Sequence, residues 1–357
     1  MDAADLDYDL PAEAIAQTPA EPRDSARLLV DRGPDRPPAH RAVADLAELL
    51  DAGDVLVVND TEVIPARLPL RKATGGAVEV LLLERRPEGW WEALVRPSRR
   101  VADGTRLVPA TATDGPAADL VVEVGERLGD DGRRRVTVHG GVDDLDALAA
   151  VGEVPLPPYI HEPLADPGRY QTVYAAHPGS VAAPTAGLHL TDALLDRCGA
   201  RGVTLVRVEL VVGLGTFRPI TAERVEDHPM HAERYRIPPA AQEVLGPRLG
   251  SGAGAPDRFG GRVVAVGTTV VRALESWAAT GRPEGATDLF IRGDHHFALV
   301  ERLLTNFHVP RSSLLALVEA FVGPRWRDLY ATALAERYLF LSFGDAMLLD
   351  RAPEGTR

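Results

Sequence analysis

The segment from Gly179 to His189 is the part of this sequence most suited to binding and chemistry. It offers backbone amides, the hydroxyl of Ser180 and an imidazole, with almost no apolar bulk to bury. Pro184 removes a ladder hydrogen-bond donor, which favours a loop over a strand. Thr191 is placed to cap a following helix, and free amides at a helix N-terminus favour an anionic or electron-rich group. The alternative is an ordinary glycine-rich turn.

Other polar side chains stand where apolar runs stop. Residues 53–58 form an apolar run that predicts a buried strand, and Asn59, Asp60 and Thr61 follow it. Two further strands, over 203–212 and 262–266, run into polar glycine-containing turns, and helices are expected over 270–279 and 314–321. Open α/β sheets bind ligands at such strand ends, so the sequence predicts an α/β domain with its site there.

Residues 66–150 have a different character. Short β-rich runs at 78–83, 90–95, 120–124 and 134–138 are separated by Gly, Asp and Pro clusters, which indicates a small antiparallel barrel or sandwich. We therefore expect an α/β catalytic domain over 1–65 and 151–357, interrupted by a β-domain over 66–150. The basic stretches at 96–100 and 133–135 could supply phosphate contacts, although such runs are more often solvated loops.

Composition excludes several classes of protein. The 357 residues carry a net charge of −13, which argues against nonspecific coating of nucleic acid but permits a local basic patch. The sequence shows neither a signal peptide nor an apolar run long enough for a membrane helix, so we expect a cytoplasmic protein. Cys198 is the one cysteine and is expected to be a buried structural thiol. Lys72 is the one lysine, which disfavours a Schiff-base mechanism.

Three catalytic signatures are weak or absent. His228, His231 and Glu233 lack the spacing of a metal site. Ser180 and His189 lack the Gly-x-Ser-x-Gly turn of a serine hydrolase, and no complete dinucleotide or Walker motif is present. The remaining hydroxyls, carboxylates, Arg and His at strand ends suit a polar, nucleoside-like substrate with general acid and base assistance.

Nine runs of sequence together resemble the S-adenosylmethionine:tRNA ribosyltransferase-isomerase family of queuosine biosynthesis, from Tyr8 to Leu349. They lie at 53–67, 155–160, 169–175, 179–189, 215–219, 231–233, 267–276, 305–308 and 344–348. The resemblance implies a large α/β domain with an inserted β-barrel, no metal and no cofactor. It also implies that S-adenosylmethionine, as a consumed co-substrate, gives its ribosyl carbons to the aminomethyl group of a 7-deazaguanine at the tRNA wobble position. Adenine and methionine are released and an epoxycyclopentane remains.

This chemistry requires proton transfer. The sulfonium acidifies the C5′ hydrogens, so a general base beside that carbon would start the isomerisation, and an acid would help adenine to leave. The catalytic candidates are His189, His231, Asp60 and Glu275, with the roles of acid and base left open. The substrate-binding candidates are Asn59, Thr61, Arg67, Tyr170, Gln171, Ser180, Pro184, Thr185, Gly187, Gly215, Thr216, Arg218, Glu233, Thr268, Thr269, Arg272, Asn306, His308 and Arg311. The candidates for tRNA binding are Arg96, Arg99 and Arg100.

Two departures from the family pattern keep alternatives open. Val211 stands where the family usually has His, and Gly293-Asp294-His295 stands where it usually has Pro-Gly-Tyr. One change deletes an imidazole and the other adds a carboxylate. The alternatives are a paralogue that ribosylates a free deazapurine or another small amine, and a noncatalytic tRNA-binding module. We expect a monomer.

Overall fold

The computed structural model describes residues 1–353 apart from 112–118, 130–131, 141–143, 214–218, 231 and 250–259. The chain forms two compact units. The large unit comprises Met1–Thr61, Pro157–His177 and Ala183–Arg357, and the small unit comprises Glu62–Leu156 and Pro178–Ala182. The expected division lay at residues 66 and 150. The return of Pro178–Ala182 to the small unit has a local cause, because strand β11 (His177–Ser180) pairs with β4 (Thr61–Val63).

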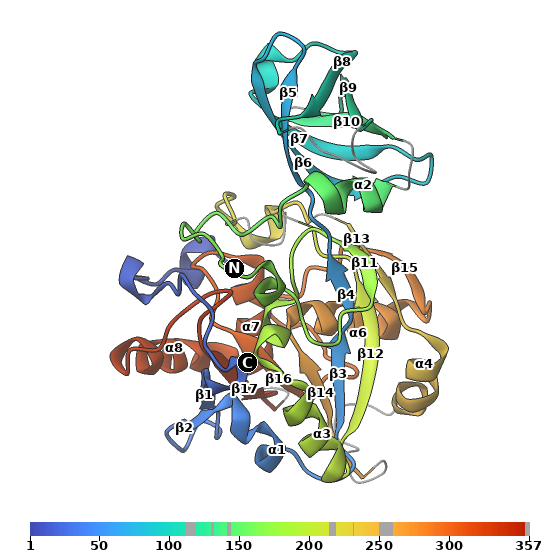
Figure 1. Cartoon of the computed structure of the whole chain (residues 1–357). Coiled ribbons are helices and arrows are strands. Elements are labelled where there is room, and N and C mark those ends of the chain that lie inside the picture. The colour runs from blue at the N-terminus through green and yellow to red at the C-terminus, as the bar shows by residue number, and fades with distance from the viewer. Residues whose placement is uncertain are drawn as a thin grey trace. The chain divides into compact units, whose positions relative to one another are not determined.

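A nine-stranded sheet organises the described part of the large unit, in the order β15-β13-β12-β3-β14-β16-β17-β1-β2 (Figure 1). Strands β12, β3, β14 and β16 are parallel, whereas β17 runs antiparallel to β16 and parallel to β1. The strands are β1 (Arg27–Val30), β2 (Ala39–Ala42), β3 (Val55–Asn59), β12 (Thr204–Leu210), β13 (Glu233–Arg236), β14 (Val263–Val266), β15 (Glu284–Thr287), β16 (Arg302–Asn306) and β17 (Ala346–Asp350).

Helices cover this sheet. The α-helices are α1 (Leu46–Leu49), α3 (Asp192–Ala200), α4 (Pro239–Leu245), α6 (Thr268–Thr280), α7 (Ser313–Val322) and α8 (Trp326–Ala335). Short 3-10 helices are η1 (Ala3–Leu6), η2 (Ala12–Ala14), η3 (Arg23–Ser25), η4 (Val43–Asp45), η7 (Pro167–Tyr170), η8 (Thr185–His189), η10 (Val225–Asp227), η11 (Gly246–Arg248) and η12 (Gly323–Arg325). The predicted cap is confirmed, because the Thr191 hydroxyl accepts a hydrogen bond from Leu194 N at 3.1 Å.

The core explains why the central strands are apolar throughout. Every residue of β3 and β14 is buried. Leu56 and Val58 of β3 belong to one hydrophobic cluster with Leu46 of α1 and Leu194 of α3, while α6 packs on β12, β3 and β14. A parallel sheet with helices on it loses the alternation of apolar and polar residues, as the sequence had indicated. Cys198 is buried in this core, as predicted.

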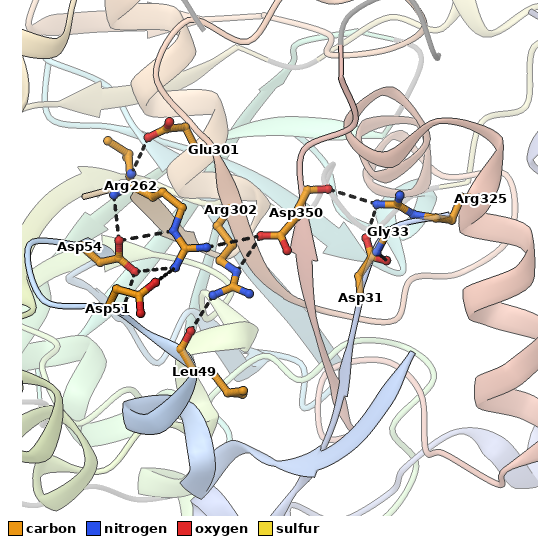
Figure 2. Close-up of polar contacts among 11 residues, drawn as sticks. Asp31, Gly33, Leu49, Asp51, Asp54, Arg262, Glu301, Arg302, Arg325 and Asp350 are labelled. Carbon is orange, nitrogen blue, oxygen red and sulfur yellow. Dashed lines mark hydrogen bonds and ion pairs between the residues drawn. The ribbon is translucent and has the colours of Figure 1, made fainter. Parts of the chain in front are cut away.

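Ion pairs fix one edge of the sheet, where β3, β14 and β16 begin and β17 ends (Figure 2). Arg262 lies 3.0 Å from Asp54, and Arg302 lies 2.8 Å from Asp350. Arg325 pairs with Asp31 just after β1. The carboxyl ends of β3, β14 and β16 therefore lie at the opposite edge of the sheet.

The small unit is a closed six-stranded antiparallel barrel in the order β10-β7-β6-β5-β8-β9, coloured blue-cyan to green in Figure 1. Its strands are β5 (Arg67–Lys72), β6 (Ala77–Arg85), β7 (Trp91–Arg96), β8 (Thr105–Pro109), β9 (Val121–Arg127) and β10 (Arg133–His139), with helices η5 (Ser98–Arg100) and α2 (Asp144–Val151). The barrel is confirmed. Strands β5 and β8 were not expected from the sequence, because Pro69 interrupts the β-pattern of β5 and Pro109 ends that of β8.

None of the helices in the described ranges is both long and apolar enough to cross a membrane.

Candidate active site

A pocket lies at the carboxyl edge of the large sheet. Its lining includes Pro184 and Thr185 of the predicted loop, Thr268 and Thr269 at the start of α6, and Asn306 at the end of β16. His308 also lines it. The cavity volume is only about 40 Å³, so a nucleoside-sized ligand requires the lining side chains to move apart.

A chain of hydrogen bonds links the predicted loop to β16. The Asn306 amide oxygen accepts from the Thr185 hydroxyl at 3.0 Å, and the Asn306 amide nitrogen donates to His189 Nε2 at 3.0 Å. The same nitrogen lies 3.4 Å from the Asp345 carbonyl oxygen. The tertiary structure thus brings together three candidates that lie up to 121 residues apart in the sequence.

Burial keeps His189 neutral. The side chain is buried, and burial together with the nearby charges of Arg169 and Arg23 lowers its pKa to about 4. A neutral imidazole can accept the Asn306 hydrogen bond, but a base with so low a pKa has little driving force to remove a proton. In this geometry the imidazole orients the Asn306 amide, which itself lines the pocket.

His308 is neutral for a similar reason. Burial lowers its pKa to about 3, and its Nε2 lies 3.1 Å from the Thr305 hydroxyl. Its backbone nitrogen donates to the Tyr330 hydroxyl at 3.0 Å. His308 therefore contributes a fixed, uncharged surface to the pocket.

The N-terminus of α6 forms another part of the pocket. Gly267 has φ 90, a conformation that favours glycine, and it lets β14 turn directly into the helix. Thr268 and Thr269 follow in the first turn, and both are buried. The Thr269 hydroxyl has no hydrogen-bond partner among the described residues. Helix amides with an adjacent hydroxyl are well suited to binding a carboxylate.

Glu233 and Arg272 form a buried ion pair between β13 and α6. Glu233 also accepts a hydrogen bond from Gly213 N at 3.1 Å, and Arg272 donates to the Leu289 and Thr287 carbonyls at 3.2 and 3.3 Å. These contacts join α6 to the chain that leaves β12. The two candidates are paired with each other and do not line this pocket.

Asp60 lies in a separate cluster. Its carboxylate is 3.3 Å from His177 Nδ1, and Glu209 is 3.8 Å from the same nitrogen. Burial raises the Asp60 pKa, although His177 opposes this shift. The three residues can each offer one ligand atom within 4.8 Å of the others. Arg236 already pairs with Glu209 at 2.7 Å, which neutralises part of the charge that a metal ion would need.

Several candidates make contacts within the fold. The Glu275 carboxylate accepts hydrogen bonds from Ala298 N, Leu299 N and Val300 N at 2.7 to 3.1 Å, and burial raises its pKa. The Asn59 side chain bridges to Leu210 N and O at 3.1 and 2.9 Å. The structure does not place Glu275 or Asn59 in the pocket lining.

The remaining large-unit candidates are also engaged with neighbouring residues. Thr61 donates to the Leu210 carbonyl at 3.3 Å, and the Gln171 carbonyl accepts from Arg23 at 2.8 Å. Tyr170 packs edge-on against Phe343. Gly187 is so close to the Tyr174 hydroxyl that any Cβ would overlap it. Arg311 is paired with Asp7 at 2.6 Å.

The other candidates lie outside the described residues or in the small unit. Gly215, Thr216, Arg218 and His231 lie outside the described residues. In the small unit, Ser180 is buried at the end of β11 and Arg67 pairs with Glu79 at 3.3 Å. Arg96 ends β7, and Arg99 and Arg100 follow in η5, with all three exposed.

Sequence reasoning missed part of the pocket wall. Tyr159 and Ser342 both line it, and their hydroxyls lie 2.7 Å apart. Burial raises the pKa of Tyr159 to about 12, so the phenol stays protonated. Leu341, beside them, has φ 71, a left-handed conformation that is costly for leucine. The Pro-Leu-Pro-Pro-Tyr run was the available signal for Tyr159.

Known proteins resemble this chain over nearly its whole length. A family model described as queuosine biosynthesis protein matches residues 3–349. The S-adenosylmethionine:tRNA ribosyltransferase-isomerase of Symbiobacterium thermophilum is 49% identical, covering 98% of this chain and 100% of that protein. The protein of the same name from Thermus thermophilus is 51% identical, covering 96% and 98%. The crystal structure of S-adenosylmethionine tRNA ribosyltransferase from Thermotoga maritima matches with a TM-score of 0.53 and 36% identity, over 96% of this chain and 99% of that one.

Proposed function

The chain belongs to the queuosine biosynthesis protein family, and from that premise we propose that it is an S-adenosylmethionine:tRNA ribosyltransferase-isomerase. The reaction joins the ribosyl carbons of S-adenosylmethionine to the aminomethyl nitrogen of 7-aminomethyl-7-deazaguanine in tRNA. The product carries an epoxycyclopentane, and adenine and methionine leave. S-adenosylmethionine is a consumed co-substrate, and we propose that no further cofactor takes part.

The observation that best supports this function is the pocket at the carboxyl edge of the sheet. It combines the N-terminus of α6 with the hydrogen-bonded chain from Thr185 through Asn306 to His189. We assign the methionine carboxylate of the donor to the amides of Thr268 and Thr269, because a helix N-terminus and a free hydroxyl both favour a carboxylate. This assignment leaves Asn306 and His308 to contact the nucleoside part.

The proton transfers place different demands on the histidines. His189, with its low pKa and its hydrogen bond to Asn306, is assigned a positioning role. The base that removes the C5′ proton needs a higher pKa to be effective at neutral pH. His231 stays a catalytic candidate, and the roles of base and acid are left unassigned.

The acceptor is tRNA in this proposal, held in part through Arg96, Arg99 and Arg100 on the small unit. Each neutralised phosphate steepens the loss of affinity with salt, so turnover on tRNA should fall with added salt while turnover on a small uncharged base should not. The protein would act in the cytoplasm as a monomer, and both statements stay predictions.

A side-by-side assay tests the proposal. S-adenosylmethionine is incubated with modified tRNA, with its anticodon stem-loop and with the free deazapurine base. Release of adenine and methionine in equal amounts with tRNA is the expected result. Methylated RNA with S-adenosylhomocysteine would exclude ribosyl transfer. If only the free base is turned over, the acceptor is the free base and not tRNA. If tRNA binds but no acceptor is turned over, the protein is a noncatalytic module.

A further inference from the structure

The barrel of the small unit carries a groove on its outer wall. Its apolar lining comprises Pro69, Leu70, Ala77, Val78 and Ala110, and its polar lining, called the rim below, comprises Arg67, Glu79, Arg96 and Glu153. The cavity volume is about 330 Å³, within the range of small-molecule sites. The groove is distinct from the pocket of the large unit, since the two have no lining residue in common.

Strand alternation builds this groove. Leu68, Leu70, Val78 and Val80 point into the barrel and are buried, so residues one position away on β5 and β6 face outward. Pro69 is opposite Glu79, and Glu79 is opposite Arg96 of β7. The outward side chains of three adjacent strands therefore share one surface.

The rim is held by backbone contacts. Arg67 and Glu153 exchange backbone hydrogen bonds of 3.1 and 2.8 Å, which places Glu153 beside β5. Ala110 N donates to the Pro69 carbonyl at 3.0 Å on the β8 side. Because the rim is anchored to the barrel, the groove is a preformed feature of the small unit.

Charge indicates what the groove would bind. Arg96 is exposed and forms no ion pair with any residue in the described ranges. Arg99 and Arg100 follow it in η5, and Lys72 donates to the Arg100 carbonyl, which ties η5 to β5. A cluster of exposed cations in a chain of net charge −13 is complementary to a polyanion.

We propose that the groove binds one unpaired nucleotide of the acceptor RNA; this inference rests on the proposed function. The base would lie against Pro69 and Ala77, two of the apolar lining residues. Arg96 would contact the base face or its phosphate, and the carboxylates of Glu79 and Glu153 would accept hydrogen bonds from N–H groups on the base edge. Splayed-out bases of single-stranded loops are recognised by such stacking and edge contacts.

Two variants separate base docking from simple phosphate attraction. Ala77→Phe fills the apolar part of the groove without changing charge, and Arg96→Gln removes one exposed cation. Arg106→Gln on β8 is the matched charge control, since Arg106 is also exposed but does not line the groove. Ala102→Phe is the steric control, placed on an exposed loop outside the groove.

Binding is measured with an anticodon stem-loop and with stem-loops in which each unpaired base is replaced by an abasic site. We expect Ala77→Phe to weaken binding roughly tenfold, as for loss of one stacked base, with an unchanged salt slope. One abasic position should weaken wild-type binding by a similar factor and should have no further effect on Ala77→Phe. Arg96→Gln should make the slope of log affinity against log salt concentration shallower by about one, which corresponds to the loss of one phosphate contact.

Two results overturn the inference. One is that Ala77→Phe binds RNA as tightly as wild type does. The other is that every abasic position weakens RNA binding by Ala77→Phe to the same extent, so that no position loses its effect in the variant. Circular dichroism of Ala77→Phe confirms that the barrel is intact. Failure of the proposed function has a different signature, namely wild-type protein that releases no adenine with any acceptor. RNA binding and its coupling to the groove are measured independently of that outcome.

Discussion

The neutral, buried His189 should make the large unit less stable in mild acid than at neutral pH. Its pKa of about 4 lies below the value of about 6.5 expected in the unfolded chain. The unfolded state therefore binds the extra proton between these two values. The contribution of neutral His189 to the free energy of unfolding is therefore fully present above pH 6.5. It is lost as the pH falls from 6.5 toward 4.

The size of the loss follows from the same two values. Each pH unit within the window costs about 1.4 kcal/mol per proton. His189 alone should lower the free energy of unfolding by about 2 kcal/mol at pH 5, relative to neutral pH. The variant His189→Gln removes the titration and keeps an amide oxygen that can accept the hydrogen bond from Asn306 Nδ2. Its stability should therefore depend less steeply on pH.

Urea unfolding at pH 7.5, 6 and 5 measures this difference. Hydrogen exchange of peptides from α6 reports on the large unit without a contribution from the barrel. His139→Gln is the control, because the His139 side chain is exposed. The reasoning is refuted if wild type and His189→Gln lose stability with the same pH slope, or if His139→Gln alters the slope as much.

Three further predictions follow from the described contacts. Asn306→Ala should lower kcat/KM for adenine release by roughly 10²-fold, measured by steady-state assay with urea midpoints as the control; an equal fall in folded fraction would attribute the loss to packing. Glu233→Gln should lower the free energy of unfolding by about 3–5 kcal/mol, because it leaves Arg272 buried without its charged partner. The double variant Glu233→Gln with Arg272→Met should recover part of that free energy, as measured by urea unfolding. Chelation by EDTA followed by gel filtration should leave turnover unchanged, since Arg236 already neutralises Glu209 in the one cluster of potential metal ligands in the described ranges; activity restored only by added metal would contradict this.

The sequence by itself determined the architecture and the edge of the sheet where the pocket lies. The continuous apolar run of β3 is typical of a strand buried on both faces, and Thr191 could be identified as a helix cap from its place before an apolar-periodic segment. The small polar turn after β14 placed Thr268 and Thr269 at a strand end. These features depend on local patterning, so they could be predicted without the tertiary structure.

Only the tertiary structure decided which polar residues line the pocket. A buried carboxylate can be satisfied by a ligand or by backbone amides, and sequence does not distinguish the two. Glu275 lies two turns along α6 from Thr268. Its carboxylate nevertheless accepts hydrogen bonds from three backbone amides, at residues 298–300, in the segment that precedes β16. Tyr159 and Ser342, 183 residues apart, meet in the pocket wall because the chain returns to the same edge of the sheet. The run at 155–159 was a signal for Tyr159 itself, but nothing local in the sequence indicates its contact with Ser342.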